Sequence, residues 1–419
     1  MKYPQKIHIF PGKLSGTVVV SGAKNSALRM LAASLLTKES ITLTNFPTHL
    51  LDVQIHIDML RLLGKEVDIL ENSVIITESK PLNTELNWNE RSIRNTLLIL
   101  GALTARFGEA KVPLPEGCKL GDRKFDLHFE LITKLGAAVW QEKNQLFSKS
   151  NQSKLQGTTI ELHIRSTGAT ENALLCAVLA EGKTEIINPH LRPEILDLIE
   201  LLSKMGAEIK VNGSRSITIL GVSSLQGAEH EVIPDNAEAI TWAVAAAITN
   251  SEIKIKNFPK EQLEAPLLHL RKSGLTLNFQ GSDAVVGKCN ISPVEIATGP
   301  YPGINSDIQP VMALYGATSI GTTMVTDLRF KNRYQYLYEL QKMGMEGYVE
   351  DNTLYIATRG RKLFGAEVEA TDIRTGITLL LAGLIADKKT TINNAWQIFR
   401  GYNNLLEKMD KLNIKYQVE

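Results

Sequence analysis

The chain has 419 residues, which is long enough for two or three domains with large hydrophobic cores. Its 46 basic and 45 acidic residues nearly cancel, so an anion site must come from a local cluster of charge. Three widely spaced cysteines exclude a disulfide framework and a metal site built from cysteine pairs. The chain shows no signal peptide and no apolar run of membrane-spanning length. We therefore expect a cytoplasmic protein that binds neither nucleic acid nor membrane.

A helix that ends at glycine or asparagine and leads into a strand recurs six times along the chain. Glycine and asparagine tolerate the left-handed conformation at a helix C-cap, and alternating apolar residues typical of strands follow them. Successive copies are 72, 70, 68, 70 and 69 residues apart, a longer period than the usual solenoid range of about 20–50 residues. The spacing predicts six copies of one α/β unit. The six residues are Gly64, Gly136, Gly206, Gly274, Gly344 and Asn413.

A second helix is predicted about half a period before each of these positions. It is so rich in alanine and leucine that most of its faces must be buried. A short strand follows each copy, and four units open with the pattern Leu-x-Gly, which places glycine at 16, 157, 227 and 365. The predicted buried helices are 25–36, 94–106, 170–180, 236–248, 307–318 and 373–386.

Buried apolar helices between strands favour an α/β fold with helices inside and sheets outside. Three such units can close one core, so we expect two lobes, each an inside-out α/β barrel of three units. The chain should cross between the lobes near Gly22 and near Pro234. The first lobe would then hold residues 22–233, including the loop around Cys118, and the second would hold residues 1–21 and 234–419.

The first turns of the buried helices carry most of their polar residues. Asp235 and Asp372 are interpreted as ordinary N-caps. Three of these turns instead carry a cation, which the helix dipole opposes, and this repeated unfavourable charge indicates an anionic ligand. Arg333 and Arg400 add guanidinium groups suited to bidentate binding of carboxylate or phosphate. The three cations are Lys24, Arg94 and Arg374.

The remaining motifs narrow the chemistry. The sequence has no Walker motif, dinucleotide fingerprint, metal-ligand cluster or Ser-His-Asp signature, so we expect neither a cofactor nor a metal. His128 is predicted to be a hydrogen-bonding residue, Cys176 to pack in the core, and Cys289 has no assigned role. Cys118 lies between Gly117 and Gly121, near several basic side chains that favour the thiolate. The pattern predicts a mobile surface loop with a reactive thiol.

Six motifs resemble one known family. They are Ser21-Gly-Ala-Lys-Asn25, Pro115-Glu-Gly-Cys-Lys-Leu-Gly121 with the following Asp126-Leu-His128, Ser166-Thr-Gly-Ala-Thr-Glu-Asn172, Arg192-Pro-Glu194, Ala370-Thr-Asp372-Ile-Arg374 and Phe399-Arg-Gly-Tyr402. With the repeated units they span the whole chain, which resembles the UDP-N-acetylglucosamine 1-carboxyvinyltransferase family of enolpyruvyl transferases. The cysteine loop separates this family from 5-enolpyruvylshikimate-3-phosphate synthase.

The resemblance implies a reaction and its participants. The enolpyruvyl group of phosphoenolpyruvate would be transferred to the 3-hydroxyl of UDP-N-acetylglucosamine with release of phosphate and without a metal, as the first committed step of peptidoglycan synthesis. Phosphoenolpyruvate and a UDP-sugar would be the small-molecule partners of a monomer or weak oligomer. Fosfomycin, an epoxide that mimics phosphoenolpyruvate, would alkylate Cys118.

The resemblance also implies a role for individual residues. Asp307 would bind the acceptor hydroxyl and take its proton, and Cys118 would give a proton to the methylene carbon. Phosphoenolpyruvate would be held by Lys24, Arg123 and Arg400, with Arg94 and Arg374 nearby. The other substrate-binding residues would be Asn25, Asn95, Lys124, Phe125, Asp126, Leu127, His128, Ser166, Thr167, Gly168 and Arg333.

Several positions depart from the family pattern on the acceptor side. Ile304-Asn-Ser306 replaces Phe-Pro-Thr before Asp307, and Asn236 replaces an arginine. Leu191, Phe399 and Lys124-Phe125 also differ. The acceptor therefore stays open between UDP-N-acetylglucosamine and another nucleotide or nucleotide sugar, as in a paralogue of secondary metabolism. A non-catalytic nucleotide-sugar-binding protein is the alternative from another class. Retention of the basic residues together with Cys118 and Asp307 argues against it.

Overall fold

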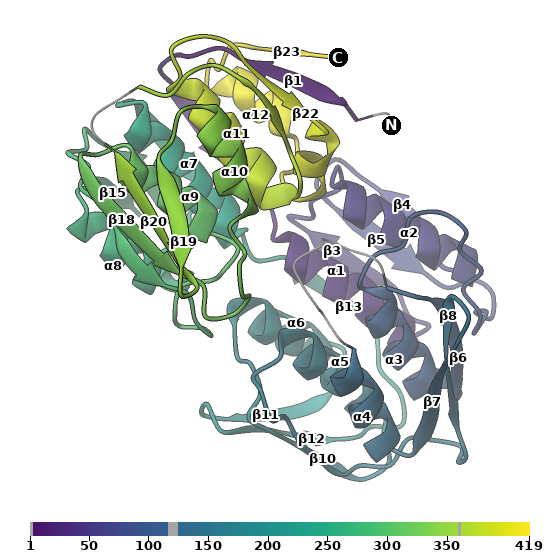
Figure 1. The fold of residues 1–419 in the computed structure, drawn as a ribbon. Coiled ribbons are helices and arrows are strands. Elements are labelled where there is room, and N and C mark those ends of the chain that lie inside the picture. Colours follow the sequence, from purple (N-terminus) through teal and green to yellow (C-terminus); the bar gives the residue numbers. More distant parts are fainter. Residues whose placement is uncertain (1–2, 116–124, 359–361) are drawn as a thin grey trace. The chain divides into compact units, whose positions relative to one another are not determined.

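The computed structural model describes residues 3–115, 125–358 and 362–419 (Figure 1). These residues form two compact units. The described residues within 22–233 are called the first lobe, and those within 1–21 and 234–419 are called the second lobe. Within the described ranges, no helix combines the length and the apolar character that crossing a membrane requires.

The first lobe has three buried helices and three more exposed ones. The buried helices are α1 (Lys24–Ala33), α3 (Thr96–Phe107) and α5 (Thr167–Ala177), and a short 3-10 helix, η1 (Ser34–Leu36), follows α1. The others are α2 (Leu51–Leu63), α4 (Asp126–Lys134) and α6 (Pro193–Lys204). The strands are β3 (Ile41–Thr44), β4 (Glu66–Ile69), β5 (Val74–Thr77), β6 (Glu109–Pro113), β7 (Ala137–Glu142), β8 (Gln145–Ser150), β9 (Thr159–Glu161), β10 (Lys183–Ile187), β11 (Glu208–Asn212), β12 (Ser216–Leu220) and β13 (Ala228–Glu231).

The second lobe repeats this arrangement. Its buried helices are α7 (Asn236–Ile248), α9 (Gln309–Ala317) and α11 (Ile373–Leu384). The others are α8 (Glu264–Lys272), α10 (Gln335–Lys342), α12 (Leu405–Lys411), η2 (Lys260–Gln262) and η3 (Ala395–Arg400). The strands are β1 (Lys6–Ile9), β2 (Ser15–Val19), β14 (Glu252–Lys256), β15 (Leu277–Gln280), β16 (Asp283–Val286), β17 (Glu295–Ala297), β18 (Gly321–Thr326), β19 (Gly347–Glu350), β20 (Thr353–Thr358), β21 (Glu367–Glu369), β22 (Thr390–Asn393) and β23 (Tyr416–Val418).

One sheet pattern recurs in the described part of the chain. Five four-stranded sheets have the same order, in which an opening strand pairs in parallel with a second strand and two antiparallel strands complete the sheet. The five orders are β13-β3-β5-β4, β9-β10-β12-β11, β2-β14-β16-β15, β17-β18-β20-β19 and β21-β22-β1-β23. The sixth sheet is β6-β8-β7, with a parallel bridge between Glu85 and Lys111 in place of the opening strand. Each lobe thus holds three units, as the repeat predicts.

Strands from the ends of each segment close the lobes. In the first lobe β13, the last strand of its segment, pairs in parallel with β3, the first. In the second lobe β2 pairs in parallel with β14, and β1 lies between β22 and β23. The N-terminal residues therefore supply one strand to each of two sheets in the second lobe.

The buried helices form the centre of each core. All residues of α11 are buried, and α7, α9 and α11 contact one another (Figure 1). The two hydrophobic cores are separate, one in each lobe. The expected α/β fold with internal helices is confirmed. The helix predicted at 236–248 has the bounds of α7, and the ends of the other five differ from the prediction by at most three residues. The helix α5 begins at Thr167 because Ser166 is its N-cap.

The repeated glycines have two physical causes. Those that end helices have positive φ angles, from 86° at Gly344 to 112° at Gly64, and Asn413 has 55°. Those in the Leu-x-Gly pattern lie against backbone carbonyl groups of a neighbouring segment. A Cβ atom would come within 2.4 Å of the Lys411 carbonyl oxygen at Gly16 and within 2.5 Å of the Ser40 oxygen at Gly227. The two glycine patterns therefore mark a helix end and a close approach to the backbone of a neighbouring segment.

Candidate functional site

The predicted acceptor-binding residue of the second lobe lies at the start of a buried helix. Asp307 precedes α9, whose first turn carries Pro310, and its backbone N–H donates to Asn305 Oδ1 over 3.1 Å. Its carboxylate receives Arg333 Nη2 at Oδ1 (2.8 Å) and Arg374 Nη2 at Oδ2 (3.2 Å). The Asp307 side chain keeps 26 % exposure, whereas the side chains of the two arginines keep 6 % and 8 %. The two buried arginines thus hold the carboxylate in place, and part of its surface stays exposed to solvent.

Arg374 is held by the first turn of α11. Asp372 caps that helix, accepting from the backbone N–H groups of Arg374 and Thr375, as the sequence predicts. Burial by itself lowers the pKa of Arg374, but Asp307, Tyr402 and Asp235 together outweigh it and the pKa is raised. The guanidinium therefore stays charged and supplies permanent positive charge beside Asp307.

A phenol group completes this contact. The Thr241 hydroxyl donates to the Ala237 carbonyl oxygen, so Tyr402 donates to Thr241 over 2.8 Å and accepts from Arg374 Nη1 over 3.3 Å. Burial raises the pKa of Tyr402. Tyr402 was noted in the sequence only as part of a motif, and no local pattern assigned it a polar partner.

Arg400, another predicted anion-binding residue, ends η3 and is buried. Its Nη1 donates to Gln397 Oε1 over 2.8 Å. The second lobe therefore brings Asp307, Arg333 and Arg374 into direct contact, and Gln397 holds Arg400.

In the first lobe the predicted cations lie at or before the first turns of two buried helices. Lys24 begins α1, and its Nζ lies 3.4 Å from Asp52 Oδ2 on α2. Arg94 and Asn95 precede α3, and Asn95 Nδ2 donates to the Leu28 carbonyl oxygen over 2.8 Å. This bond ties the start of α3 to α1. Asn25 is half-buried beside Lys24.

His128 on α4 is buried against the start of α5. Asn172 Nδ2 donates to His128 Nδ1 over 3.1 Å, so Nε2 carries the proton of the neutral ring. Burial, and then the charge of Arg94, lower the pKa of His128 to about 3. A Cβ atom on Gly168 would lie 3.1 Å from Nε2. The imidazole therefore leaves little space for a side chain at residue 168. The bond from Asn172 supports the expected hydrogen-bonding role of His128.

The other predicted residues around α4 and α5 differ in burial. Thr167 Oγ1 hydrogen-bonds His190 Nδ1 over 2.8 Å, and Ser166 caps α5. Phe125 is half-buried, Asp126 is exposed in the first turn of α4, and Leu127 is buried. Cys118, Arg123 and Lys124 lie outside the described residues.

A polar network in the first lobe was not anticipated. Arg29 Nε donates to Glu171 Oε1 over 2.5 Å, joining α1 to α5, and burial raises the pKa of Glu171. His56 on α2 is fully buried, and neither ring nitrogen has a hydrogen-bond partner among the described residues. Burial and then Arg29 lower the pKa of His56 to about 3. Glu171 lies within a motif quoted for the resemblance, but sequence spacing could not pair it with Arg29.

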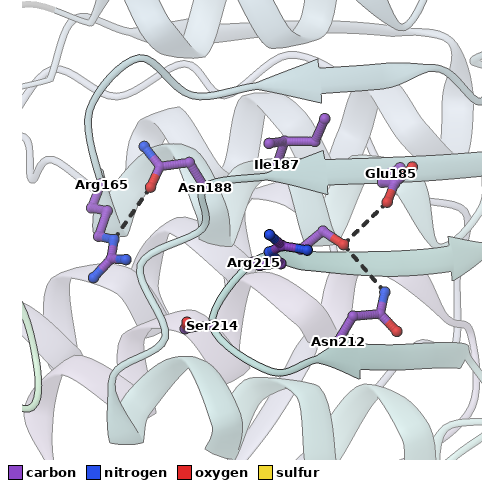
Figure 2. Close-up of a pocket in the computed structure, with 8 residues that line it drawn as sticks. Arg165, Glu185, Ile187, Asn188, Asn212, Ser214 and Arg215 are labelled. Carbon is purple, nitrogen blue, oxygen red and sulfur yellow. Dashed lines mark hydrogen bonds between the residues drawn. The ribbon is translucent and has the colours of Figure 1, made fainter.

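A pocket of about 640 Å³ lies on the sheet of β9 to β12 in the first lobe, and none of the predicted residues lines it (Figure 2). Arg165 Nε donates to Asn188 Oδ1 over 3.2 Å, and the Ser216 hydroxyl donates to Glu185 Oε1 over 3.1 Å. Two exposed arginines, Arg165 and Arg215, line it together with this carboxylate. The pocket is polar and of mixed charge.

Within the described ranges, one group of side chains has donors close enough for a metal ion: Asp197, Glu200 and His230, whose ligand atoms lie within 4.8 Å of one another. His230 Nε2 donates to Asp197 Oδ1 over 2.7 Å, and Nδ1 lies 3.1 Å from Lys204 Nζ. Lys204 also pairs with Glu200 over 2.9 Å. An ammonium group thus already occupies the lone pair that a metal would need.

Comparison with known proteins gives consistent results. The family model of EPSP synthase (3-phosphoshikimate 1-carboxyvinyltransferase) matches residues 10–409. UDP-N-acetylglucosamine 1-carboxyvinyltransferase 2 of Carboxydothermus hydrogenoformans is 37 % identical, with 97 % of each chain covered. The UDP-N-acetylglucosamine 1-carboxyvinyltransferase of Prochlorococcus marinus is 39 % identical over 97 % of this chain and 89 % of its own.

Among solved structures, the enolpyruvyl transferase NikO from Streptomyces tendae superimposes with a TM-score of 0.88, covering 99 % of both chains at 23 % identity. That likeness shows the shared fold, and the identity to the curated relatives shows the family. The chain is therefore a transferase that belongs to the enolpyruvyl transferase family of UDP-N-acetylglucosamine 1-carboxyvinyltransferases.

Proposed function

We propose that this protein transfers the enolpyruvyl group of phosphoenolpyruvate to the 3-hydroxyl of UDP-N-acetylglucosamine and releases phosphate, in the first committed step of peptidoglycan synthesis. The relatives named for this reaction support the proposal. The observation that carries it is the Asp307 carboxylate, held by two buried arginines and still partly exposed. A carboxylate so placed can accept a hydroxyl proton while its own position stays fixed.

In the proposed reaction, the oxygen of the acceptor hydroxyl bonds to C2 of phosphoenolpyruvate while Asp307 takes the hydroxyl proton. Cys118 gives a proton to the methylene carbon, which becomes a methyl group. The C2–phosphate oxygen bond then breaks, and phosphate leaves with the proton that Asp307 had taken. The methyl carbon returns a proton to the Cys118 thiolate, which restores both the double bond and the thiol.

The other roles follow the family resemblance, and the charges of the substrate agree with them. Phosphoenolpyruvate carries a phosphate and a carboxylate, which account for cations at helix N-termini where the helix dipole alone opposes them. We assign Lys24, Arg123 and Arg400 to phosphoenolpyruvate, with Arg94 and Arg374 supporting them. Arg333 joins them through its contact with Asp307. The nucleotide sugar is assigned to Asn25, Asn95, Lys124, Phe125, Asp126, Leu127, His128, Ser166, Thr167 and Gly168.

A second candidate function is the same transfer to another nucleotide or nucleotide sugar. Asn305 favours it, because its side chain accepts from the Asp307 backbone N–H where the family has proline, beside the carboxylate that would meet the acceptor. Phosphate release from phosphoenolpyruvate should therefore be measured with UDP-N-acetylglucosamine and a panel of other nucleotide sugars. The main proposal expects UDP-N-acetylglucosamine to give the highest kcat/KM. A higher value with another acceptor would replace it.

The role of Cys118 has its own test. Fosfomycin with the nucleotide sugar present should add covalently to Cys118, which mass spectrometry detects. Cys118→Ala should lose most turnover, whereas Cys118→Asp, which keeps a proton donor, should stay active and resist the epoxide. Cys289→Ala is the matched control because this half-buried thiol has no assigned role. Full turnover in Cys118→Ala would show that another group is the acid.

A further inference from the structure

Behind Asp307 lies a buried carboxylate that neither the motifs nor the predicted reaction uses. Asp327 follows β18 and has 0 % exposure. Its Oδ1 accepts from Thr298 Oγ1 (2.8 Å) and from the backbone N–H groups of Arg329 (2.9 Å) and Phe330 (3.0 Å). Its Oδ2 accepts from the Ser306 hydroxyl. A buried charge needs such compensation, and here three of the four donors meet one oxygen.

The second carboxylate oxygen of Asp327, Oδ2, has a different partner from Oδ1. Among the described residues, Ser306 is the one hydrogen-bond donor to Asp327 Oδ2. A serine hydroxyl has a single proton, so donating it to Asp327 leaves the oxygen lone pairs free to accept. Arg333 Nη1 donates to that oxygen over 2.8 Å. Asp327 therefore sets the direction in which Ser306 accepts.

Arg333 then has two defined acceptors for one planar group. Nη1 donates to Ser306 and Nη2 donates to Asp307 Oδ1, each over 2.8 Å. Two contacts from adjacent nitrogens fix the plane of a guanidinium group as well as its position. The Arg333 side chain is almost completely buried, so a lost partner on Nη1 would not be replaced by solvent.

We propose that Asp327 and Ser306 form a positioning relay, which orients Arg333 and thereby fixes the Asp307 carboxylate for proton abstraction from the acceptor hydroxyl. This inference rests on the proposed function for its kinetic consequence. In this relay Asp327 and Ser306 act on Asp307 through Arg333. Threonine, which the family has in place of Ser306, carries the same hydroxyl, whereas alanine would remove both of its hydrogen bonds.

The kinetic test compares substitutions of Ser306 with a matched control. Ser306→Ala should lower kcat about tenfold to a hundredfold, with the KM for phosphoenolpyruvate nearly unchanged. Ser306→Thr should restore kcat to within about threefold of the original enzyme. Ser273→Ala is the control, because Ser273 is equally buried in the same lobe and donates to the Pro293 backbone carbonyl oxygen. Equal kcat in Ser306→Ala and Ser273→Ala would overturn the relay.

Asp327→Asn tests the direction of the relay without changing its shape. The amide keeps an oxygen for the three Oδ1 donors and presents N–H to Ser306. The hydroxyl proton then loses its acceptor. The relay predicts a fall in kcat similar to that of Ser306→Ala, and an unchanged kcat contradicts it. If Ser306→Ala does not fold, Ser306→Cys fills the same space with a weak donor and acceptor and is expected to lower kcat equally.

A substrate-free measurement separates this inference from the proposed function. Nitrogen NMR should resolve separate signals for the two Nη atoms of Arg333, because rotation about the Nε–Cζ bond, which exchanges these two nitrogens, is hindered when both are held. In Ser306→Ala the signals should merge, and in Ser306→Thr they should stay separate. Unchanged signals in Ser306→Ala would overturn the relay even in an active enzyme. An original enzyme without phosphate release would overturn the function, and the NMR result would still decide the relay.

Discussion

The two lobes share one repeated unit but use different polar chemistry at the starts of their buried helices. All ten tyrosines lie in the second lobe, whereas six of the eight histidines lie within 22–233. In the first lobe the buried partners include imidazole and amide groups, such as His128 with Asn172, besides the ion pair of Arg29 and Glu171. In the second they are phenols with charged groups, such as Tyr402 with Arg374. Repeated backbone architecture therefore leaves these first turns free to diverge.

This difference has a physical consequence. A buried neutral imidazole gains a proton in acid only by unfolding or rearrangement, and the pKa values of His56 and His128 are lowered to about 3. The phenols stay neutral, because burial raises the pKa of Tyr334 to about 12 and that of Tyr336 well above its usual value. The first lobe should therefore be the more acid-sensitive one. The second lobe should carry the permanent positive charges, on Arg333 and Arg374, that hold Asp307.

The largest expected effect is on the charged cluster of the second lobe. Asp307→Asn removes the proposed proton acceptor while keeping its shape, so kcat should fall about a hundredfold to ten-thousandfold in the phosphate-release assay. Asp283→Asn is the control, since Asp283 lies in the same lobe and pairs only with surface groups such as Lys254. An Asp307→Asn enzyme as active as the control would remove Asp307 from the mechanism.

The next effect concerns the planar contacts of Arg374. Lysine has a single ammonium group, which cannot reach Asp307 and Tyr402 as the guanidinium does. Arg374→Lys should therefore lower kcat/KM about tenfold to a hundredfold in steady-state assays. Arg271→Lys, an exposed arginine on α8, should leave kcat/KM unchanged. Equal activity of the two variants would show that a positive charge at residue 374 is sufficient and that the planar guanidinium group is not required.

A smaller effect tests whether the lobes share their architecture but keep separate cores. In Gly227→Ala and Gly16→Ala the new methyl group meets a carbonyl oxygen, at Ser40 in the first lobe and Lys411 in the second. Each should lose about 1–3 kcal/mol of stability. Hydrogen exchange should show the loss in α3 for Gly227→Ala and in α9 for Gly16→Ala. Gly12→Ala, where a Cβ meets open space, is the control. Equal losses in both lobes would contradict separate cores.

The smallest effect is the acid sensitivity of the first lobe. The pKa of His56 is about 3 in the folded protein and about 6.5 when unfolded, so the unfolded state binds more protons as pH falls below 6.5. Stability should therefore be greatest above pH 6.5 and fall by about 1 kcal/mol per buried histidine between pH 6.5 and 5.5.

His56→Phe should remove the part of this acid-induced loss of stability that His56 causes. The measurement is the pH dependence of hydrogen exchange in α1 and α3. His269→Phe on α8 of the second lobe is the control and should leave that dependence unchanged. A first lobe equally protected at both pH values would show that the imidazoles gain protons without unfolding.

Much of the fold followed from local patterns in the sequence. The repeated C-cap residues, the alanine-rich helices and the Leu-x-Gly pattern predicted six units with internal helices, and Asp235 and Asp372 are the N-caps expected of them. These features are readable because burial of one helix face and the backbone conformation of one residue depend on neighbours in the chain.

Family resemblance adds candidate functional residues. Of these, Asp307 is in contact with Arg333 and with Arg374 in the structure. No pattern indicated that His56 is buried without a partner, or that Asp327 stands behind Ser306. In the sequence, His56 looks like any other residue of an amphipathic helix. Asp327 looks like any other polar residue that follows a strand. The residues that surround His56 and the hydrogen-bond partners of Asp327 come from separate segments, so neighbouring residues in the sequence do not indicate this chemistry.

The sequence by itself determined the repeated unit, the class of fold and most candidate residues, because those depend on periodicity and on motifs. Only the tertiary structure decided which strand closes each lobe, with β13 returning to β3 and β1 entering between β22 and β23. It also decided which polar atom meets which, as in the contacts of Arg333 with Ser306 and Asp307. The physical reason is that hydrogen bonds between distant segments depend on packing in three dimensions, which no local pattern records.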